Sequence, residues 1–188
     1  MSKIISTHWI SLDGYISGPA GELDFVRGDD QLGEYEIGMA SAVGHMLFGR
    51  KTYDMLSGYW SQAAESPNVA DWEKIYAGKI NPLPKSVISH GLQTAGWENS
   101  QILRDPAEVA GLKAKADGDI LIYGSASVVQ ELSRRELIDE YQLLVHPVLL
   151  GGGTSLFGAI GQRLTLNKVR SQNFDSGIVL DVYQTARA

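Results

Sequence analysis

Gly49-Arg50-Lys51-Thr52-Tyr53 is the stretch that best indicates how this chain folds and what it binds. The apolar Met46-Leu47-Phe48 precedes it and a helical pattern follows to Leu56, which predicts a strand, a tight glycine turn and the start of a helix. Two cations at a helix start oppose the helix dipole, which favours anions there. The pattern is explained if an anion binds between these side chains and the free N–H groups of the first turn. The alternative is a helix that tolerates two solvated cations.

The composition fits one globular domain over residues 1–188. Of the 188 residues, 44% are hydrophobic and 20% are charged, which is enough chain to bury a core. The chain has no cysteine, which excludes disulfides and thiolate metal sites. Its four histidines show no metal-ligand spacing, so we expect no bound metal.

Charge and hydropathy narrow the range of partners. The net charge of −6 argues against nucleic acid as the main partner. No segment approaches the ~20 apolar residues of a membrane span. The first residues lack the apolar region and cleavage site of a signal peptide. We therefore expect a cytoplasmic protein whose partner is a small molecule, not a membrane or a nucleic acid.

Strand-like and helix-like segments alternate in the first part of the chain, and strands dominate in the last part. The predicted strands are 3–10, 46–48, 85–90, 102–103, 119–123 and 138–150, with a terminal hairpin formed by 164–175 and 178–185. The predicted helices are 34–43, 50–56, 106–116 and 128–134, and residues 58–84 are expected to be an irregular connection. This order predicts an α/β fold with a largely parallel sheet and an antiparallel edge at the C-terminal hairpin.

Polar segments follow three of the predicted strands. They are Gly49–Thr52, Ser89–Gly91 and Gly124–Ser127. Ligands of open α/β sheets bind beyond the carboxyl ends of the strands, where two helix starts and the hydroxyls of Thr52 and Ser125 can share a pyrophosphate. Arg50 can fork onto a 2′-phosphate, the group that distinguishes NADP from NAD. The plain alternatives are a helix cap at Ser125 and an exposed turn at His90, and no GxGxxG fingerprint follows the first strand.

The order of these motifs resembles the dihydrofolate reductase-like family, in the branch that includes the reductase domain of the riboflavin-biosynthesis protein RibD. The matching segments cover most of the chain: Ser11–Ile16, Phe48–Tyr53, Pro84–Ser89, Ile122–Ala126, Leu137–Tyr141, His146–Gly153 and Leu156-Phe157. The resemblance implies a three-layer fold with a mostly parallel central sheet, helices on both faces and an antiparallel C-terminal edge hairpin. It also implies NADPH as the cofactor and a homodimer.

The resemblance assigns roles to residues of this sequence. Those expected to contact the cofactor are Gly49, Arg50, Lys51, Thr52, Ser89, Gly124, Ser125 and Ala126. Those expected to lie over the substrate or close its pocket are Asp13, Gly14, Tyr15, Leu149, Gly151 and Phe157.

Asp13 and Glu34 are the candidate catalytic residues. A reductase must supply a proton as well as a hydride, and Asp13 lies in the loop that the family places over the nicotinamide. Asp-Gly is also a common turn pair, so Asp13 has a structural alternative. Dihydrofolate reductases carry an acidic residue on the first helix that holds the pterin, and Glu34 and Glu36 lie near that position. We select Glu34, although each of the two glutamates can also be an ordinary residue of a helix surface.

Three functions remain open at this point. The first is an NADPH-dependent reductase of a pterin-like or 5-amino-6-(5-phosphoribosylamino)uracil-like heterocycle. The second is a protein that binds NADPH without turnover, and the third is an authentic dihydrofolate reductase. A bifunctional RibD enzyme is not expected, because its zinc deaminase domain needs cysteines that this chain lacks.

Overall fold

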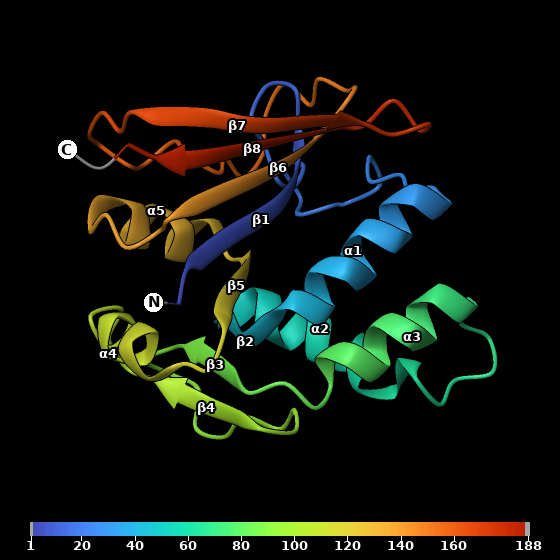
Figure 1. The fold of residues 1–188 in the computed structure, drawn as a ribbon, viewed down its shortest axis with the longest axis vertical. Coiled ribbons are helices and arrows are strands. Elements are labelled where there is room, and N and C mark those ends of the chain that lie inside the picture. The colour runs from blue at the N-terminus through green and yellow to red at the C-terminus, as the bar shows by residue number, and fades with distance from the viewer. Residues whose placement is uncertain (1, 187–188) are drawn as a thin grey trace.

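One eight-stranded sheet forms the middle layer of the protein (Figure 1). The computed structural model describes residues 2–186. The strands are β1 (Ile4–Ser11), β2 (Val43–Gly49), β3 (Lys85–Ile88), β4 (Ser100–Leu103), β5 (Asp119–Gly124), β6 (Glu140–His146), β7 (Leu166–Asn173) and β8 (Val179–Thr185). Their order across the sheet is β4-β3-β2-β5-β1-β6-β8-β7.

The sheet is parallel except at its C-terminal edge. Every neighbouring pair from β4 to β6 is parallel, whereas β8 runs antiparallel to both β6 and β7. The carboxyl ends of β1, β2 and β5 therefore meet at one edge of the sheet, with β5 between the other two. The predicted mixed sheet with an antiparallel C-terminal hairpin is confirmed.

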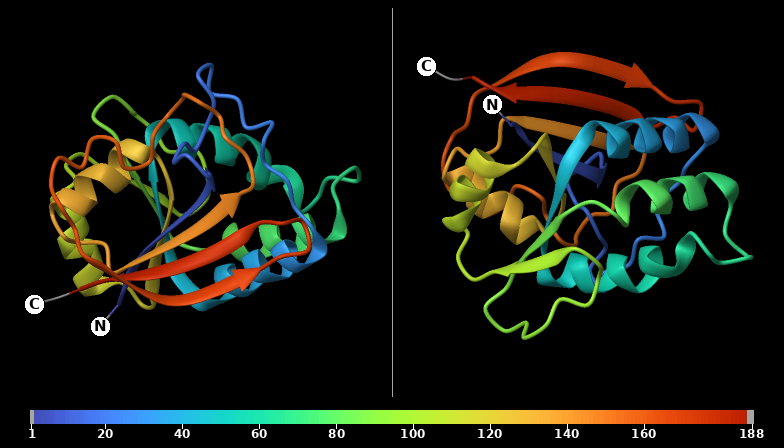
Figure 2. Two further views of the ribbon diagram at one scale, coloured as in Figure 1. Left: turned by 90° about the horizontal axis from the view of Figure 1, so that it is seen from above. Right: turned by 60° about the horizontal axis from the view of Figure 1, so that its bottom comes forward.

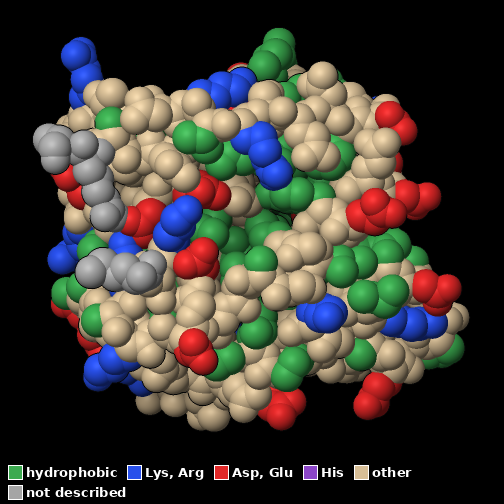
Figure 3. Space-filling model, in the orientation of Figure 1, with side chains coloured by type: hydrophobic (Ala, Val, Ile, Leu, Met, Phe, Trp, Pro, Cys, Tyr) green, Lys and Arg blue, Asp and Glu red, His purple; other side chains and the backbone are tan. Residues whose placement is uncertain are grey.

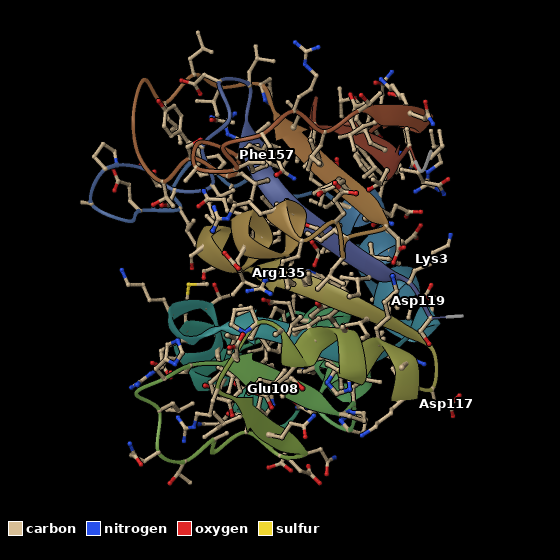
Figure 4. The ribbon with its side chains drawn as sticks, turned by 90° about the vertical axis from the view of Figure 1, so that its left-hand side faces the viewer. Lys3, Glu108, Asp117, Asp119, Arg135 and Phe157 are labelled. Atoms are coloured by element: carbon tan, nitrogen blue, oxygen red, sulfur yellow. The ribbon has the colours of Figure 1, made fainter. Side chains whose placement is uncertain are left out.

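Helices cover both faces of the sheet (Figures 1 and 2). They are α1 (Asp30–Ala42), α2 (Arg50–Ala63), α3 (Asp71–Ile80), α4 (Glu108–Lys115) and α5 (Ala126–Arg134). Successive side chains of β5 point to opposite faces of the sheet, as in any strand. Ile120 and Ile122 pack with Val129 of α5, and Leu121 packs with Met39 of α1. Helices α4 and α5 lie on one side, in front in Figure 4, and α1, α2 and α3 lie on the other.

The prediction of an irregular connection over residues 58–84 was wrong. Helix α2 continues to Ala63, and α3 occupies Asp71–Ile80. Helix α3 buries Tyr76, Ala77 and Ile80 on one face, a spacing that the many polar residues and prolines of this segment hide. Helix α1 likewise starts earlier than predicted, and its first turn is capped by the Asp29 side chain.

No helix within residues 2–186 combines the length and the apolar character needed to cross a membrane.

Candidate functional site

Two helix starts meet at the carboxyl edge of the sheet. Helix α2 follows β2 and α5 follows β5, and these two strands are neighbours. A Cβ on Gly49 would lie 2.2 Å from Ser125 Oγ and 3.0 Å from Ser125 N, so glycine is what allows this approach. Gly124 has a φ of +130°, and a Cβ there would lie 2.9 Å from Thr52 Oγ1. The structure thus brings Gly49, Thr52, Gly124 and Ser125 together.

These two helix starts differ from the other three. Neither α2 nor α5 has a side-chain cap or an acidic residue in its first turn. The first turns of α1, α3 and α4 all carry carboxylates. The first N–H groups of a helix have no partner one turn earlier. In α5, Val128 N donates to Ser125 O at 3.0 Å, so the N–H groups before it, like the first ones of α2, are left for an external acceptor. The pair has the properties of an anion site.

A cavity of about 310 Å³ extends from these helix starts towards α1 and α3. Lys51, Thr52, Ser125 and Ala126 line one part of it. The other lining residues come from β1, α1, β2, α2, α3, β5 and the loops after β1 and β6, and many of them are aromatic or apolar. The cavity therefore joins a polar, cationic region to an apolar one.

Glu36 is the buried acid of the apolar region. It projects from α1, is 4% exposed, and lines the cavity. Trp9 Nε1 donates a hydrogen bond to Glu36 Oε1 at 3.0 Å. Burial raises the pKa of Glu36 from 4.5 to about 7, against the lowering effect of the Trp9 hydrogen bond. Within residues 2–186 no donor reaches Oε2, so this oxygen is available to a ligand.

Neutral polar groups surround Glu36. The Tyr76 hydroxyl donates a hydrogen bond to the Tyr123 hydroxyl, and burial raises the pKa of both tyrosines well above the usual value. Burial also lowers the pKa of His8 to about 3, so its ring is uncharged at neutral pH. His8 Nε2 and Thr7 Oγ1 are buried without a partner in the described part of the chain, and both residues line the cavity. Glu36 is thus the group in this region that can change charge near neutral pH.

The family model of the RibD C-terminal domain matches residues 2–180. The chain belongs to the RibD C-terminal domain family. This membership confirms the resemblance that the sequence motifs indicated.

Relatives of this RibD C-terminal domain protein are similar over nearly their whole length. The uncharacterized protein YyaP of Bacillus subtilis (strain 168) is 33% identical over 96% of this chain and 94% of its own. A crystal structure from Shewanella sp. PV-4, of a protein named for riboflavin biosynthesis, has a TM-score of 0.76 and 25% identity over 98% of this chain and 99% of its own.

The fold is also that of a dihydrofolate reductase. The enzyme from Enterococcus faecalis, solved in complex with NADP(H), has a TM-score of 0.65 and 14% identity over 98% of this chain and 97% of its own. Together with the layers described above, this confirms the predicted dihydrofolate reductase-like fold.

Asp13, a candidate catalytic residue, lies outside the cavity of this family member. Its carboxylate is exposed and accepts hydrogen bonds from Ser11 Oγ at 2.6 Å, Leu150 N at 3.1 Å and Gly151 N at 2.8 Å. These bonds, that of Ser11 foremost, lower the pKa of Asp13. Asp13 joins the loop after β1 to the loop after β6, which is the structural alternative for an Asp-Gly pair.

Glu34, the other candidate catalytic residue, also lies outside the cavity. Its side chain is exposed on α1 and does not line the cavity, whereas that of Glu36 does. Two residues along a helix turn the side chain by ~200°, so only one of the two glutamates can face the sheet. The sequence offered both, and the structure brings Glu36 to the site.

The residues expected to close the substrate pocket lie elsewhere. Gly14, Tyr15, Leu149, Gly151 and Phe157 are not part of the cavity lining. Leu149 is 69% exposed, and Phe157 packs on the Tyr141 ring on the α5 side of the sheet (Figure 4).

Residues close to them in the same two loops line the cavity instead. Ile16, Ser17 and Thr154 line the cavity, because the two loops pair through Ile16 N to Thr154 O and Leu156 N to Gly14 O.

The remaining cofactor candidates are spread around the helix starts. Arg50 is exposed and forms an ion pair with Asp54, with 2.8 Å between Nε and Oδ2. Ser89, at the end of β3, lies outside the cavity, and its Oγ accepts a hydrogen bond from Leu92 N at 3.0 Å. Within residues 2–186, no three His, Asp or Glu side chains gather in a way that could hold a metal ion.

Most of the lining residues are not among the predicted site residues, and four of them matter for the chemistry of the apolar region. They are Trp9, Glu36, Tyr76 and Tyr123. The sequence does not distinguish Glu36 from Glu34, and Tyr76 lies on helix α3, which the sequence does not predict. The only usable signal was the apolar spacing on either side of Glu36, at Leu32, Met39 and Ala40.

Proposed function

We propose that this protein is an NADPH-dependent reductase that transfers a hydride to a small heterocycle held against Glu36. One observation carries the proposal: a single cavity contains both the paired helix starts of α2 and α5 and a buried carboxyl group. The first is suited to the pyrophosphate of a dinucleotide, and the second to the polar edge of a flat ring.

The residues at the helix starts fit the cofactor. The space between the two helix starts, which we call the cradle, is bordered by Gly49 and Gly124, and a Cβ on either residue would fill it. Thr52 and Ser125 add hydroxyls to the N–H groups of the first turns, and Lys51 adds a positive charge. NADPH, when bound, supplies the hydride.

Four residues around the cradle would make further contacts with the cofactor. The Arg50 guanidinium would contact the 2′-phosphate, in exchange for its exposed ion pair with Asp54. Ser89 would lie on the adenosine side, and Gly124 and Ala126 would contribute backbone groups.

Glu36 is the proposed source of the proton. A carboxyl group with a pKa of about 7 retains its proton in a large share of the molecules at neutral pH. When a C=N bond is reduced, the carbon receives the hydride and the nitrogen receives the proton of Glu36. The Trp9 hydrogen bond orients the carboxyl group, and solvent returns the proton to the carboxylate.

The test measures NADPH oxidation at 340 nm with a panel of pterins, dihydropterins and aminouracils. We expect turnover of at least one compound, and its loss in Glu36→Gln but not in Glu34→Gln, a matched control on the exposed side of α1. NADPH binding without oxidation across the panel would favour the protein without turnover. Methotrexate-sensitive reduction of dihydrofolate would identify an authentic dihydrofolate reductase.

The homodimer and the cytoplasmic location stay predictions. An edge strand can pair with a second copy of the chain, and β7 is an edge strand whose side chains are mostly exposed.

A further inference from the structure

A second cavity, of about 470 Å³, lies next to the first and shares Trp9, Glu36 and Trp60 with it. It lies at the N-terminal ends of α1 and α3, which run side by side (Figures 1 and 2). Because Glu36 lines both cavities, a ligand held at its carboxyl group in the first cavity can extend into the second.

Tryptophan rings form the apolar wall of the second cavity. The Trp60 and Trp72 rings meet edge to face with 6.4 Å between their centroids, and Trp60 also packs on Tyr76 at 4.8 Å. The Trp72 ring lies against α1 at Gly33, where a Cβ would be 3.5 Å from its Cδ2 atom. Such fixed rings offer faces that attract planar groups and cations.

Carboxylates outnumber cations around this wall. Asp29, Asp30, Glu36 and Glu73 line the second cavity, and Arg27 is the cation among its lining residues. On the side of α1 and α3, Figure 3 shows acidic side chains next to hydrophobic ones, together with some Lys and Arg side chains. Neighbouring negative charges raise the local concentration of cations and disfavour anions.

Hydrogen bonds hold two of these carboxylates in place. Asp29 accepts from Leu32 N at 2.8 Å and from Ser176 N at 2.7 Å, which favours its ionised form. Glu73 accepts from the Tyr59 hydroxyl at 2.6 Å. The acidic rim is therefore a fixed feature of the cavity.

We propose that the second cavity binds a substituent of the substrate, and that this substituent carries a protonated amine. This inference rests on the proposed function, since it takes the first cavity as the site of the reacting ring. The amine lies against the faces of Trp60 and Trp72 and is neutralised by Asp30 and Glu73.

The proposal separates two classes of substrate. A heterocycle with a phosphorylated sugar, such as a 5-amino-6-(5-phosphoribosylamino)uracil, would bring two negative charges to a site lined by carboxylates. One guanidinium, that of Arg27, does not offset them. A heterocycle with an aminoalkyl or aminoaryl chain satisfies both the rings and the charges.

Calorimetric titration of the protein without NADPH tests the inference. The probes are three 2,4-diaminopyrimidines that carry a 3-aminopropyl, a propyl or a 3-carboxypropyl chain at the same ring position. We expect the amine to bind at least tenfold more tightly than the propyl compound, and the carboxylate to bind at least tenfold more weakly. In the double variant Asp30→Asn, Glu73→Gln the amine should lose its advantage while the propyl compound keeps its affinity.

Glu34→Gln is the matched control, because it removes a charge from the same end of α1 without touching either cavity. It should leave the preference for the amine intact. Equal binding of the three probes, or no binding of the amine, would overturn the inference. NADPH binding and oxidation of NADPH with the heterocycle panel are measured separately, so a failure here is distinguishable from a failure of the proposed function.

Discussion

The two halves of the first cavity are built in different ways. The half at the helix starts consists of short sequence motifs, each placed by the strand that it follows. The half around Glu36 gathers side chains from β1, α1, α3 and β5, which lie far apart in the sequence. The first offers backbone N–H groups and cations, and the second offers aromatic rings and a carboxyl group. We therefore expect that cofactor binding and substrate chemistry can be disrupted independently.

The largest expected effect is on catalysis. Glu36→Gln keeps the shape of the side chain but removes the proton, and general acid catalysis contributes ~10²–10⁴-fold to a rate. We expect kcat with the best heterocycle to fall by about a thousandfold, while the Kd of NADPH changes by less than about twofold. Stopped-flow and fluorescence titration measure the two. Loss of NADPH affinity in this variant would show that the halves are not independent.

The pH dependence of stability should report the buried carboxyl group. Glu36 titrates at about pH 7 in the folded protein, against 4.5 for an ordinary glutamate. Its contribution to stability is therefore fully present below pH 4.5 and is lost as the pH rises through 7. The shift corresponds to about 3 kcal/mol.

Urea unfolding of the wild type and Glu36→Gln measures this contribution. The stability of the variant relative to the wild type should rise by about 3 kcal/mol between pH 4.5 and pH 8. A difference that does not change with pH would mean that Glu36 titrates normally.

A methyl group at the helix starts should affect only the cofactor. Gly49→Ala places a Cβ against Ser125, which separates the two helix starts. We expect NADPH to bind about thirtyfold more weakly, a loss of about 2 kcal/mol. Binding of a 2,4-diaminopyrimidine at Glu36 should be unchanged. Calorimetry of both ligands checks this, and a parallel loss of both affinities would contradict a cradle that serves only the cofactor.

The smallest effect concerns the choice between NADPH and NADH. Arg50→Ala should weaken NADPH by about tenfold and NADH by much less, if the guanidinium contacts the 2′-phosphate. The ion pair with Asp54 is exposed, so its loss costs little. An equal loss for the two cofactors would remove Arg50 from the 2′-phosphate site.

The same contrast explains how much could be predicted from the sequence. The parallel strands, the glycine turns and the two helix starts follow from local patterns, and the sheet order then places Gly49 beside Ser125. Glu36 could not be chosen over Glu34 from the sequence alone, because burial depends on how α1 is rotated against β1. The start of α1 at Asp30, earlier than predicted, left that rotation open.

That Asp13 and Phe157 lie outside the cavity could not be predicted for a related reason. Both lie in loops whose backbones pair with each other, and the pairing register decides which side chain faces the cavity. Helix α3 could not be predicted because its many polar residues hide the spacing of Tyr76 and Ile80. The sequence therefore gives no indication that these two residues line the cavity.

A crystal structure with bound NADPH tests the central claim most directly. We expect the pyrophosphate between the first turns of α2 and α5, beside Thr52 and Ser125, and the nicotinamide in the same cavity as Glu36. A pyrophosphate bound away from these helix starts, or a nicotinamide outside the cavity that Glu36 lines, would contradict it.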